Sequence, residues 1–192
     1  MGMIIHLCKF VPSLADLSEP LRQLLHKDSS WVGKEPQRQA FPRIKEALLS
    51  SEVPAHYDPN RPSIILADAS STGLNAGLIQ VQENVERRPI CYASRSLSET
   101  EKRYAVIKKE ALTVTWVSEK FSDHVLGLPF VLEMDHKPLT ALLNSTELSK
   151  MPPRILRFRL RLMRYTYQVQ YVPGKRQAAA DALSHGPVGT PD

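Results

Sequence analysis

The stretch IILADASSTG, residues 64–73, joins an apolar run to an abrupt polar ending at Asp68. Side chains of a β-strand alternate between two faces, so Asp68 shares a face with Ile64 and Leu66. A carboxylate therefore continues a face that is otherwise apolar. Aspartate, serine and glycine are also ordinary turn residues at the end of a strand. By itself the stretch predicts a strand, and it leaves a turn residue and a functional carboxylate as alternatives for Asp68.

The sequence around this stretch predicts a mixed α/β fold. Three strand-like runs follow one another with short polar breaks, which favours antiparallel neighbours. A long helix is expected over 98–127, because Ser98 and Glu101 have the spacing of a capping box and Gly127 follows. Strands and helices then alternate, which is typical of a mixed sheet. The five predicted strands are 63–68, 76–82, 88–95, 129–135 and 166–172, and the later predicted helices are 137–145, 154–165 and 177–184.

The first third of the chain is predicted to be helical. Apolar residues recur at near-helical spacing within 3–26 and 35–50. Pro42 lies inside the second pattern, so the helix is expected to begin near it or to kink there. Three prolines mark 53–62 as a linker. The predicted organisation is a helical segment over 1–52, the linker over 53–62, an α/β domain over 63–185 and a tail over 186–192.

Composition and charge narrow the class of protein. The chain has 192 residues, a formal net charge of +5 and 42% hydrophobic residues, as expected of a globular domain with a polyanionic partner. Its two cysteines have no metal-ligand or redox spacing, which favours a reducing compartment. No apolar run is long enough for a membrane span, and the start MGMIIHLCKF lacks a leader pattern. We expect no membrane partner and an intracellular location, cytoplasmic or nuclear.

Four carboxylates form a candidate metal site. Asp68 and Asp135 end strands, Glu110 lies in the apolar helical stripe of Ile107 and Val114, and Asp181 lies among alanines. Taken singly, each has a structural explanation as a turn, salt-bridged or exposed helix residue. Together they form an oxygen cage of the kind that Mg²⁺ prefers. Two such ions can clamp the attacking and leaving oxygens of a phosphoryl displacement.

Several stretches resemble successive signatures of the ribonuclease H domain of Ty3/gypsy-type retrotransposon polyproteins. The resemblance covers about residues 63–185, in order and without gaps. The first third is similar to the thumb and connecting segment of the same polyproteins, as in LCKFVPSLADLSEPLRQLLHKDSSW. The stretches of the ribonuclease H part are DASSTGLNAGLIQ, RPICYASRSLSETEKRYAVIKKEALTVTW, FVLEMDHKPL, PPRILRFRLRLMRYTYQVQYVPGK and ADALS.

This resemblance implies a ribonuclease H-like five-stranded sheet and a specific reaction. The family cleaves the RNA strand of RNA/DNA hybrids with Mg²⁺ or Mn²⁺, leaving a 5′-phosphate and a 3′-hydroxyl. Asp68, Glu110, Asp135 and Asp181 match its four catalytic carboxylates. Asp68 would bridge two ions, Glu110 and Asp135 would hold one of them, and Asp181 would complete the other. The polymerase motif Tyr-x-Asp-Asp is absent, so we expect no DNA synthesis by this chain.

A basic segment without acidic residues, 151–176, is the candidate surface for the hybrid. Four arginines recur at helical spacing, opposite the apolar residues Ile155, Leu156, Leu160 and Met163. The alternative is a solvated face of an amphipathic helix, but the lack of nearby acids favours backbone contact. The candidate nucleic-acid-binding residues are Arg154, Arg157, Arg161, Arg164, Lys175 and Arg176.

Two further alternatives stay open from the sequence. His136, next to Asp135, could be a general base, but a structural or capping role is favoured because its side chain should point to the opposite strand face. The chain could also be a catalytically silent binding module, or a structural subdomain that needs the missing polymerase part of its polyprotein as a partner.

Overall fold

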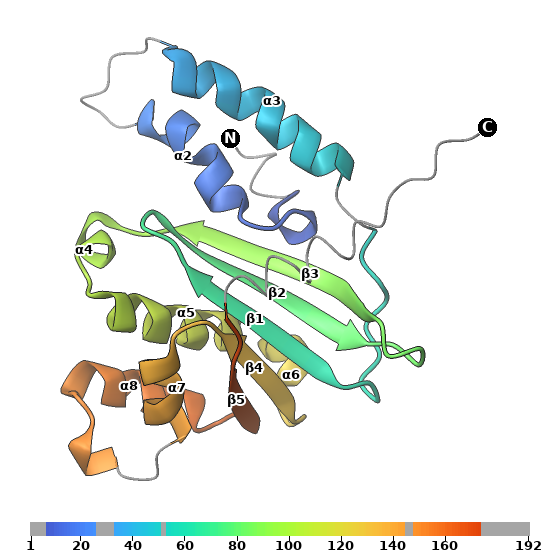
Figure 1. Cartoon of the computed structure of the whole chain (residues 1–192), viewed down its shortest axis with the longest axis vertical. Coiled ribbons are helices and arrows are strands. Elements are labelled where there is room, and N and C mark those ends of the chain that lie inside the picture. The colour runs from blue at the N-terminus through green and yellow to red at the C-terminus, as the bar shows by residue number, and fades with distance from the viewer. Residues whose placement is uncertain (1–6, 26–32, 51–52, 145–147, 174–192) are drawn as a thin grey trace.

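The structure is a computed structural model, and it describes residues 7–25, 33–50, 53–144 and 148–173. Its centre is one five-stranded sheet in the order β3-β2-β1-β4-β5 (Figure 1). β1 pairs antiparallel with β2, and β2 with β3, whereas β4 runs parallel to both β1 and β5. The strands are β1 Ser63–Ala69, β2 Gly73–Val81, β3 Arg87–Ser96, β4 Phe130–Met134 and β5 Tyr167–Tyr171. The predicted mixed sheet of five strands is confirmed.

The segment between β3 and β4 forms three helices, so the prediction of one long helix over 98–127 is wrong. The expected capping box is present, but it closes the short helix α4 (Glu99–Lys102) as a separate turn. Ala105 then adopts an extended conformation and starts α5 (Val106–Lys120). A second bend at Phe121 leads into α6 (Ser122–Val125). The capping box and Gly127 thus mark the two ends of a segment that contains two bends.

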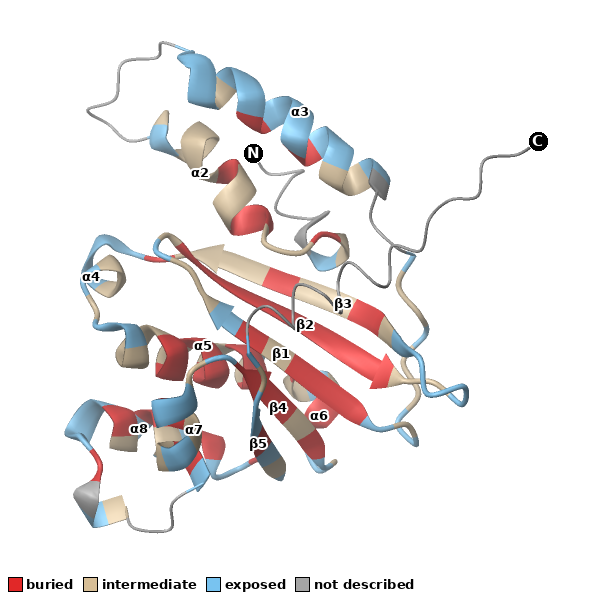
Figure 2. Cartoon of the chain, viewed as in Figure 1, coloured by how far each residue is buried: buried red, intermediate tan, exposed pale blue. Residues whose placement is uncertain are grey.

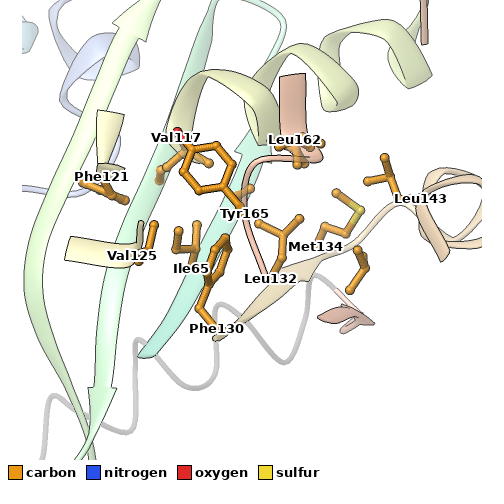
Figure 3. Close-up of a cluster of buried hydrophobic side chains, with 14 of the residues drawn as sticks. Ile65, Val117, Phe121, Val125, Phe130, Leu132, Met134, Leu143, Leu162 and Tyr165 are labelled. Carbon is orange, nitrogen blue, oxygen red and sulfur yellow. The ribbon is translucent and has the colours of Figure 1, made fainter. Parts of the chain in front are cut away.

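The main core lies between the sheet and α5. Ile65 and Ala67 of β1 and Leu132 and Met134 of β4 point toward α5 and are fully buried. Figure 3 shows this cluster, including Phe130 and Tyr165 packed close together. The helices α7 (Lys137–Asn144) and α8 (Pro153–Leu162) extend the same core, and the short helix η2 (Leu148–Lys150) precedes α8. The site described below is therefore built on a rigid, apolar base.

The N-terminal helices pack on the other face of the sheet. They are η1 (Leu7–Phe10), α2 (Leu14–Gln23) and α3 (Glu35–Ser50), and they form a small core of their own around Val11, Leu14 and Ile44. The backbone N–H of Ala15 donates a 3.0 Å hydrogen bond to Ser94 Oγ. Ser94 points to the opposite face from Ala93, which belongs to the main core. The outer side of α3 is exposed (Figure 2).

Two features of this N-terminal part differ from what the sequence predicted. The helix α3 does not begin near Pro42, because it starts at Glu35 and continues through that residue to Ser50. Pro42 is exposed, so water can reach the carbonyl that loses its hydrogen bond. Phe41 is one of the apolar residues whose spacing within 35–50 predicted this helix, yet it is 54% exposed, because Ala40 and Ile44 face α2.

The segment 53–62 contains no helix or strand, but it packs on the domain. The Ala55 N–H donates a 2.8 Å hydrogen bond to the carbonyl of Pro89, and the Tyr57 ring contacts the main core. Within the described part of the chain, none of the helices has the length and apolar character needed to cross a membrane.

Candidate metal centre

The parallel pairing of β1 with β4 brings two aspartates to one edge of the sheet. The paired register ends at Leu66 and Glu133, and Asp68 and Asp135 each follow two positions later. Both side chains are exposed to solvent. Because the two strands run in the same direction, their carboxyl ends deliver both carboxylates to the same place.

Helix α5, which packs on one face of the sheet, adds the third carboxylate near this edge. Glu110 faces the sheet in the second turn of the helix and is 3% exposed. One carboxylate oxygen from each of Asp68, Glu110 and Asp135 can be chosen so that all lie within 4.8 Å of one another. The structure thus brings together three of the four residues that the sequence singled out. Asp181 lies outside the described residues.

The pKa values of these groups reflect their crowding. Burial, followed by the charges of Asp68 and Asp135, raises the pKa of Glu110 to about 8. Desolvation, followed by the charges of Asp135 and Asp16, raises the pKa of Asp68. Three carboxylates this close repel one another, and a bound cation would remove that repulsion.

The donor set fits a hard divalent cation. All three groups offer carboxylate oxygens, and Glu110 Oε2 is buried with no hydrogen-bond partner among the residues that the structure describes. A buried polar atom of this kind normally finds a partner. Open sides at Asp68 and Asp135 leave room for the water ligands that Mg²⁺ retains. The site therefore fits Mg²⁺ or Mn²⁺ on the chemistry of its own residues.

A further carboxylate, which no pattern in the sequence indicated, lies close to this cluster. Asp16 of α2 accepts hydrogen bonds from Ser70, Thr72 and Asn75, which belong to the turn and strand that follow Asp68. No local pattern marks it, because its partners are more than 50 positions away in the chain.

His136 has the capping role that the sequence favoured. Its Nδ1 accepts a 3.1 Å hydrogen bond from the backbone N–H of Leu139, at the start of α7. The imidazole is thereby committed to the helix terminus, and the capping interpretation is confirmed.

The apolar face of α8 differs from the one that the residue spacing predicted. Ile155, Phe158 and Leu162 are the buried apolar residues, whereas Leu160 and Met163, which the spacing assigned to the apolar face opposite the arginines, are 51% and 58% exposed. The apolar residues chosen from the sequence formed a stripe rotated away from the one that meets the core.

The arginines of α8 differ in their surroundings. Arg161 makes a two-pronged contact with Glu119 of α5 at 2.8 and 2.5 Å, so the expected absence of acids is wrong for this residue. Arg154 lies over the Tyr104 ring and Arg164 over the Tyr165 ring. Arg157 is exposed. Lys175 and Arg176 fall in the part of the chain that the structure does not describe.

Comparison with known proteins gives a consistent family and fold. Residues 58–165 match the family model described as the RNase H-like domain found in reverse transcriptase. The chain is 31% identical over 185 residues to the Retrovirus-related Pol polyprotein from transposon 297 of Drosophila melanogaster. It is 32% identical over 187 residues to the Transposon Tf2-3 polyprotein of Schizosaccharomyces pombe. Each alignment covers 96% of this chain but only 17% and 14% of those relatives.

Solved structures show the same fold. The foamy viral protease-reverse transcriptase in complex with RNA/DNA hybrid aligns with a TM-score of 0.67 and 20% identity, over 89% of this chain and 24% of that chain. Its dRH form in complex with double-stranded DNA aligns with a TM-score of 0.69 and 19% identity, over 89% of this chain and 30% of that chain. Because both alignments extend beyond the family match at 58–165, they also cover part of the N-terminal helices.

Proposed function

The chain belongs to the family of RNase H-like domains found in reverse transcriptases, of the Ty3/gypsy type, and on that premise we propose that it hydrolyses the RNA strand of RNA/DNA hybrids. The observation that carries the proposal is the convergence of Asp68, Glu110 and Asp135 at one edge of the sheet. Clustered carboxylates with an exposed side suit a reaction in which the substrate itself is an anion and reaches the ions from solvent.

The roles of the residues follow from the proposed use of two divalent ions. Bound Mg²⁺, or Mn²⁺ in its place, would neutralise phosphate charge and lower the pKa of the attacking water. Asp68 would bridge both ions, Glu110 and Asp135 would hold one, and Asp181 would complete the other. The water gives up a proton and its oxygen bonds to phosphorus, while the bond from phosphorus to the 3′-oxygen breaks and that oxygen takes up a proton from solvent. The products are a 5′-phosphate and a 3′-hydroxyl.

Two partners belong to this proposal. The hybrid would lie along α8, contacting Arg154, Arg157, Arg161 and Arg164, with Lys175 and Arg176 further along the chain. Such contacts to the nucleic-acid backbone are sequence-independent and sensitive to salt. The second partner is the polymerase part of the same polyprotein, because the relatives are polyproteins of which this chain spans a small share.

The test is hydrolysis of a hybrid labelled on its RNA strand. The wild-type chain should cleave it in Mg²⁺ and stop when EDTA is added, whereas Asp68→Asn should bind the hybrid but cleave at least about a hundredfold more slowly. Asp123→Asn is the matched control, because Asp123 is exposed on α6, away from the cluster, and should cleave like wild type.

Equal cleavage by wild type and Asp68→Asn, unaffected by EDTA, would contradict the proposed mechanism. Hybrid binding without cleavage by the wild-type chain would instead support a silent binding module. A thermal melt of the isolated chain tests the third alternative, a subdomain that folds only with its polymerase part, since that alternative predicts no cooperative transition.

A further inference from the structure

The N-terminal extension contributes a carboxylate to the surroundings of the metal site. Asp16 Oδ1 accepts hydrogen bonds from Ser70 Oγ at 2.6 Å and from Thr72 Oγ1 at 2.7 Å. Its Oδ2 accepts a 2.7 Å hydrogen bond from Asn75 Nδ2. All three donors lie on the turn and strand that follow Asp68. One side chain of α2 therefore holds the whole segment that leads away from Asp68.

The close approach of α2 that makes these bonds possible depends on Gly73. A Cβ atom at that position would lie 3.0 Å from Asp16 Oδ1 and 3.3 Å from the Cβ of Ala15. Both separations are tighter than ordinary contacts between such atoms. The missing side chain at Gly73 thus allows Asp16 to reach past the turn to Asn75.

Asn75 connects Asp16 to the metal site. It stands directly opposite Asp68 in the pairing of β1 with β2, so the two side chains lie next to each other on one face of the sheet, and the Asn75 amide partly offsets the rise in the pKa of Asp68. An amide nitrogen carries two hydrogens, so Nδ2 can donate to both aspartates. Asn75 Oδ1 is buried and has no hydrogen-bond partner within the described ranges. Among the described residues, the hydrogen bond to Asp16 is therefore the contact that orients this amide.

We propose that Asp16 is a positioning residue that acts through the Asn75 amide to hold Asp68 in the orientation that binds the divalent cation. This inference rests on the function proposed above, and it assigns the N-terminal extension a part in assembling the site. The Asp16 carboxylate fixes which end of the Asn75 amide faces Asp68. If the amide turned over, its oxygen would face two carboxylates, and Asp68 would lose its donor.

The substitution Asp16→Asn tests this directly because it keeps the size of the side chain. The new amide can still accept from Ser70 and Thr72, but its nitrogen faces the nitrogen of Asn75. The Asn75 amide must then turn over or lose its partner, and in both cases its N–H no longer points at Asp68. Glu19→Gln is the matched control on α2, since Glu19 contacts Lys102 at 3.5 Å and not the turn after Asp68.

The experiment measures Mn²⁺ binding to the full chain without hybrid, by electron paramagnetic resonance of the free ion. Asp16→Asn and Asn75→Ala should each raise the dissociation constant for Mn²⁺ about tenfold, as is typical when a residue that orients a metal ligand is removed. The double variant should bind no more weakly than either single variant, because both act on the same hydrogen bond. Glu19→Gln should bind like wild type.

Cleavage of the labelled hybrid gives a second measurement. The metal concentration for half-maximal rate should rise about tenfold in Asp16→Asn, while the rate at saturating metal stays within about twofold of wild type. Asn75→Ala leaves the contacts of Asp16 with Ser70 and Thr72 intact, so it tests the same link without depending on how well α2 is held.

Unchanged Mn²⁺ binding in Asp16→Asn would overturn the inference. A further tenfold loss of Mn²⁺ affinity on adding Asp16→Asn to Asn75→Ala would also overturn it, because Asp16 would then affect the site without acting through Asn75. Failure of the proposed function itself would give a different result. Wild type and Asp68→Asn would then bind Mn²⁺ with the same affinity, and none of the other variants would change that affinity.

Discussion

At the scale of single residues, Glu110 stands out because the fold buries a carboxylate with an oxygen that lacks a hydrogen-bond partner among the described residues. The structure surrounds it with apolar neighbours on α5 and with Asp68 and Asp135 above. Its pKa of about 8 means that the metal-free protein keeps a proton there at neutral pH. A cation would have to displace that proton, so metal binding and pH are linked at this residue.

We therefore predict that the metal-free chain loses stability as the pH rises. In the unfolded chain Glu110 ionises near its ordinary value of 4.5, whereas in the folded chain it ionises only near about 8. The folded state binds more protons in that window, so the free energy of unfolding falls between the two values and then levels off. Glu110→Gln removes this effect and should be more stable than wild type at pH 8.5, by on the order of a few kcal/mol.

Urea unfolding in EDTA at pH 5 and pH 8.5 measures the difference. Glu83→Gln is a suitable control, because the Glu83 side chain is 92% exposed and its removal should leave the pH dependence as it is. Parallel pH profiles for wild type and Glu110→Gln would contradict the prediction.

The residue scale also shows what the sequence could and could not predict. Asp68, Glu110 and Asp135 could be selected because a strand end or an apolar helical stripe makes a carboxylate conspicuous. Asp16 could not, because a carboxylate on an amphipathic helix usually faces water. Asp16 accepts hydrogen bonds from Ser70, Thr72 and Asn75, and these residues come close to it only in the folded chain.

At the scale of elements, α8 shows why a correct periodicity can still give the wrong face. Both apolar and basic residues recur at helical spacing, and several rotations of the helix satisfy the pattern. The position of α5 selects the rotation that buries Ile155, Phe158 and Leu162. The same position brings Glu119 to Arg161, a contact that no local pattern reveals because the two residues are 42 positions apart.

This difference between the arginines predicts different effects on hybrid binding. Arg157→Ala should weaken binding for all hybrid sequences and lower the slope of log affinity against log salt by about 1, as expected for one lost phosphate contact. Arg161→Ala should change the slope by less, because Glu119 already holds that guanidinium. Glu119→Gln should strengthen binding by freeing Arg161.

Fluorescence anisotropy with a labelled hybrid, using Asp68→Asn to prevent cleavage, measures these slopes over a salt series. Equal slopes for Arg157→Ala and Arg161→Ala would show that the contact with Glu119 does not compete with the hybrid.

The helix boundaries also depend on the surroundings in the folded chain. The capping box at Ser98 was recognised correctly, but the restart of the helix at Ala105 has no signal in residue type. Pro42 predicted a helix start or a kink at its position, but α3 begins earlier and includes Pro42, since the exposed side of the helix lets water replace a lost hydrogen bond. Breaks in a helix depend on what surrounds it, and a single sequence does not contain that information.

At the scale of the whole molecule, the sheet separates two helical layers with different tasks. The layer of α5 and α8 carries Glu110 and the arginines that we propose contact the hybrid, whereas α2 approaches Asp68 from the other face through Asp16. The strands and the fold class could be predicted because hydrophobic alternation is local. The docking of the N-terminal helices onto the sheet depends on contacts such as Ala15 with Ser94, which are specific to the folded state.

The parallel pairing of β1 with β4 has a kinetic consequence. β1, β2 and β3 are joined by short turns and can pair early, but β4 follows only after α5 and α6. Asp68 and Asp135 are 67 positions apart (135 − 68), so their meeting requires the closure of a long loop. We therefore predict that the carboxylates come together late in folding, and that Mn²⁺ finds no assembled site to bind before the rate-limiting step.

Refolding from urea, followed by stopped-flow tryptophan fluorescence, should therefore proceed at the same rate, within about twofold, with and without Mn²⁺. Unfolding should slow about tenfold when the ion is present at ten times its dissociation constant, because only the native state binds it. Faster refolding in Mn²⁺ would mean that the strands meet earlier than this topology implies. On this prediction, a bound ion would prolong the lifetime of the native state without guiding the chain toward it.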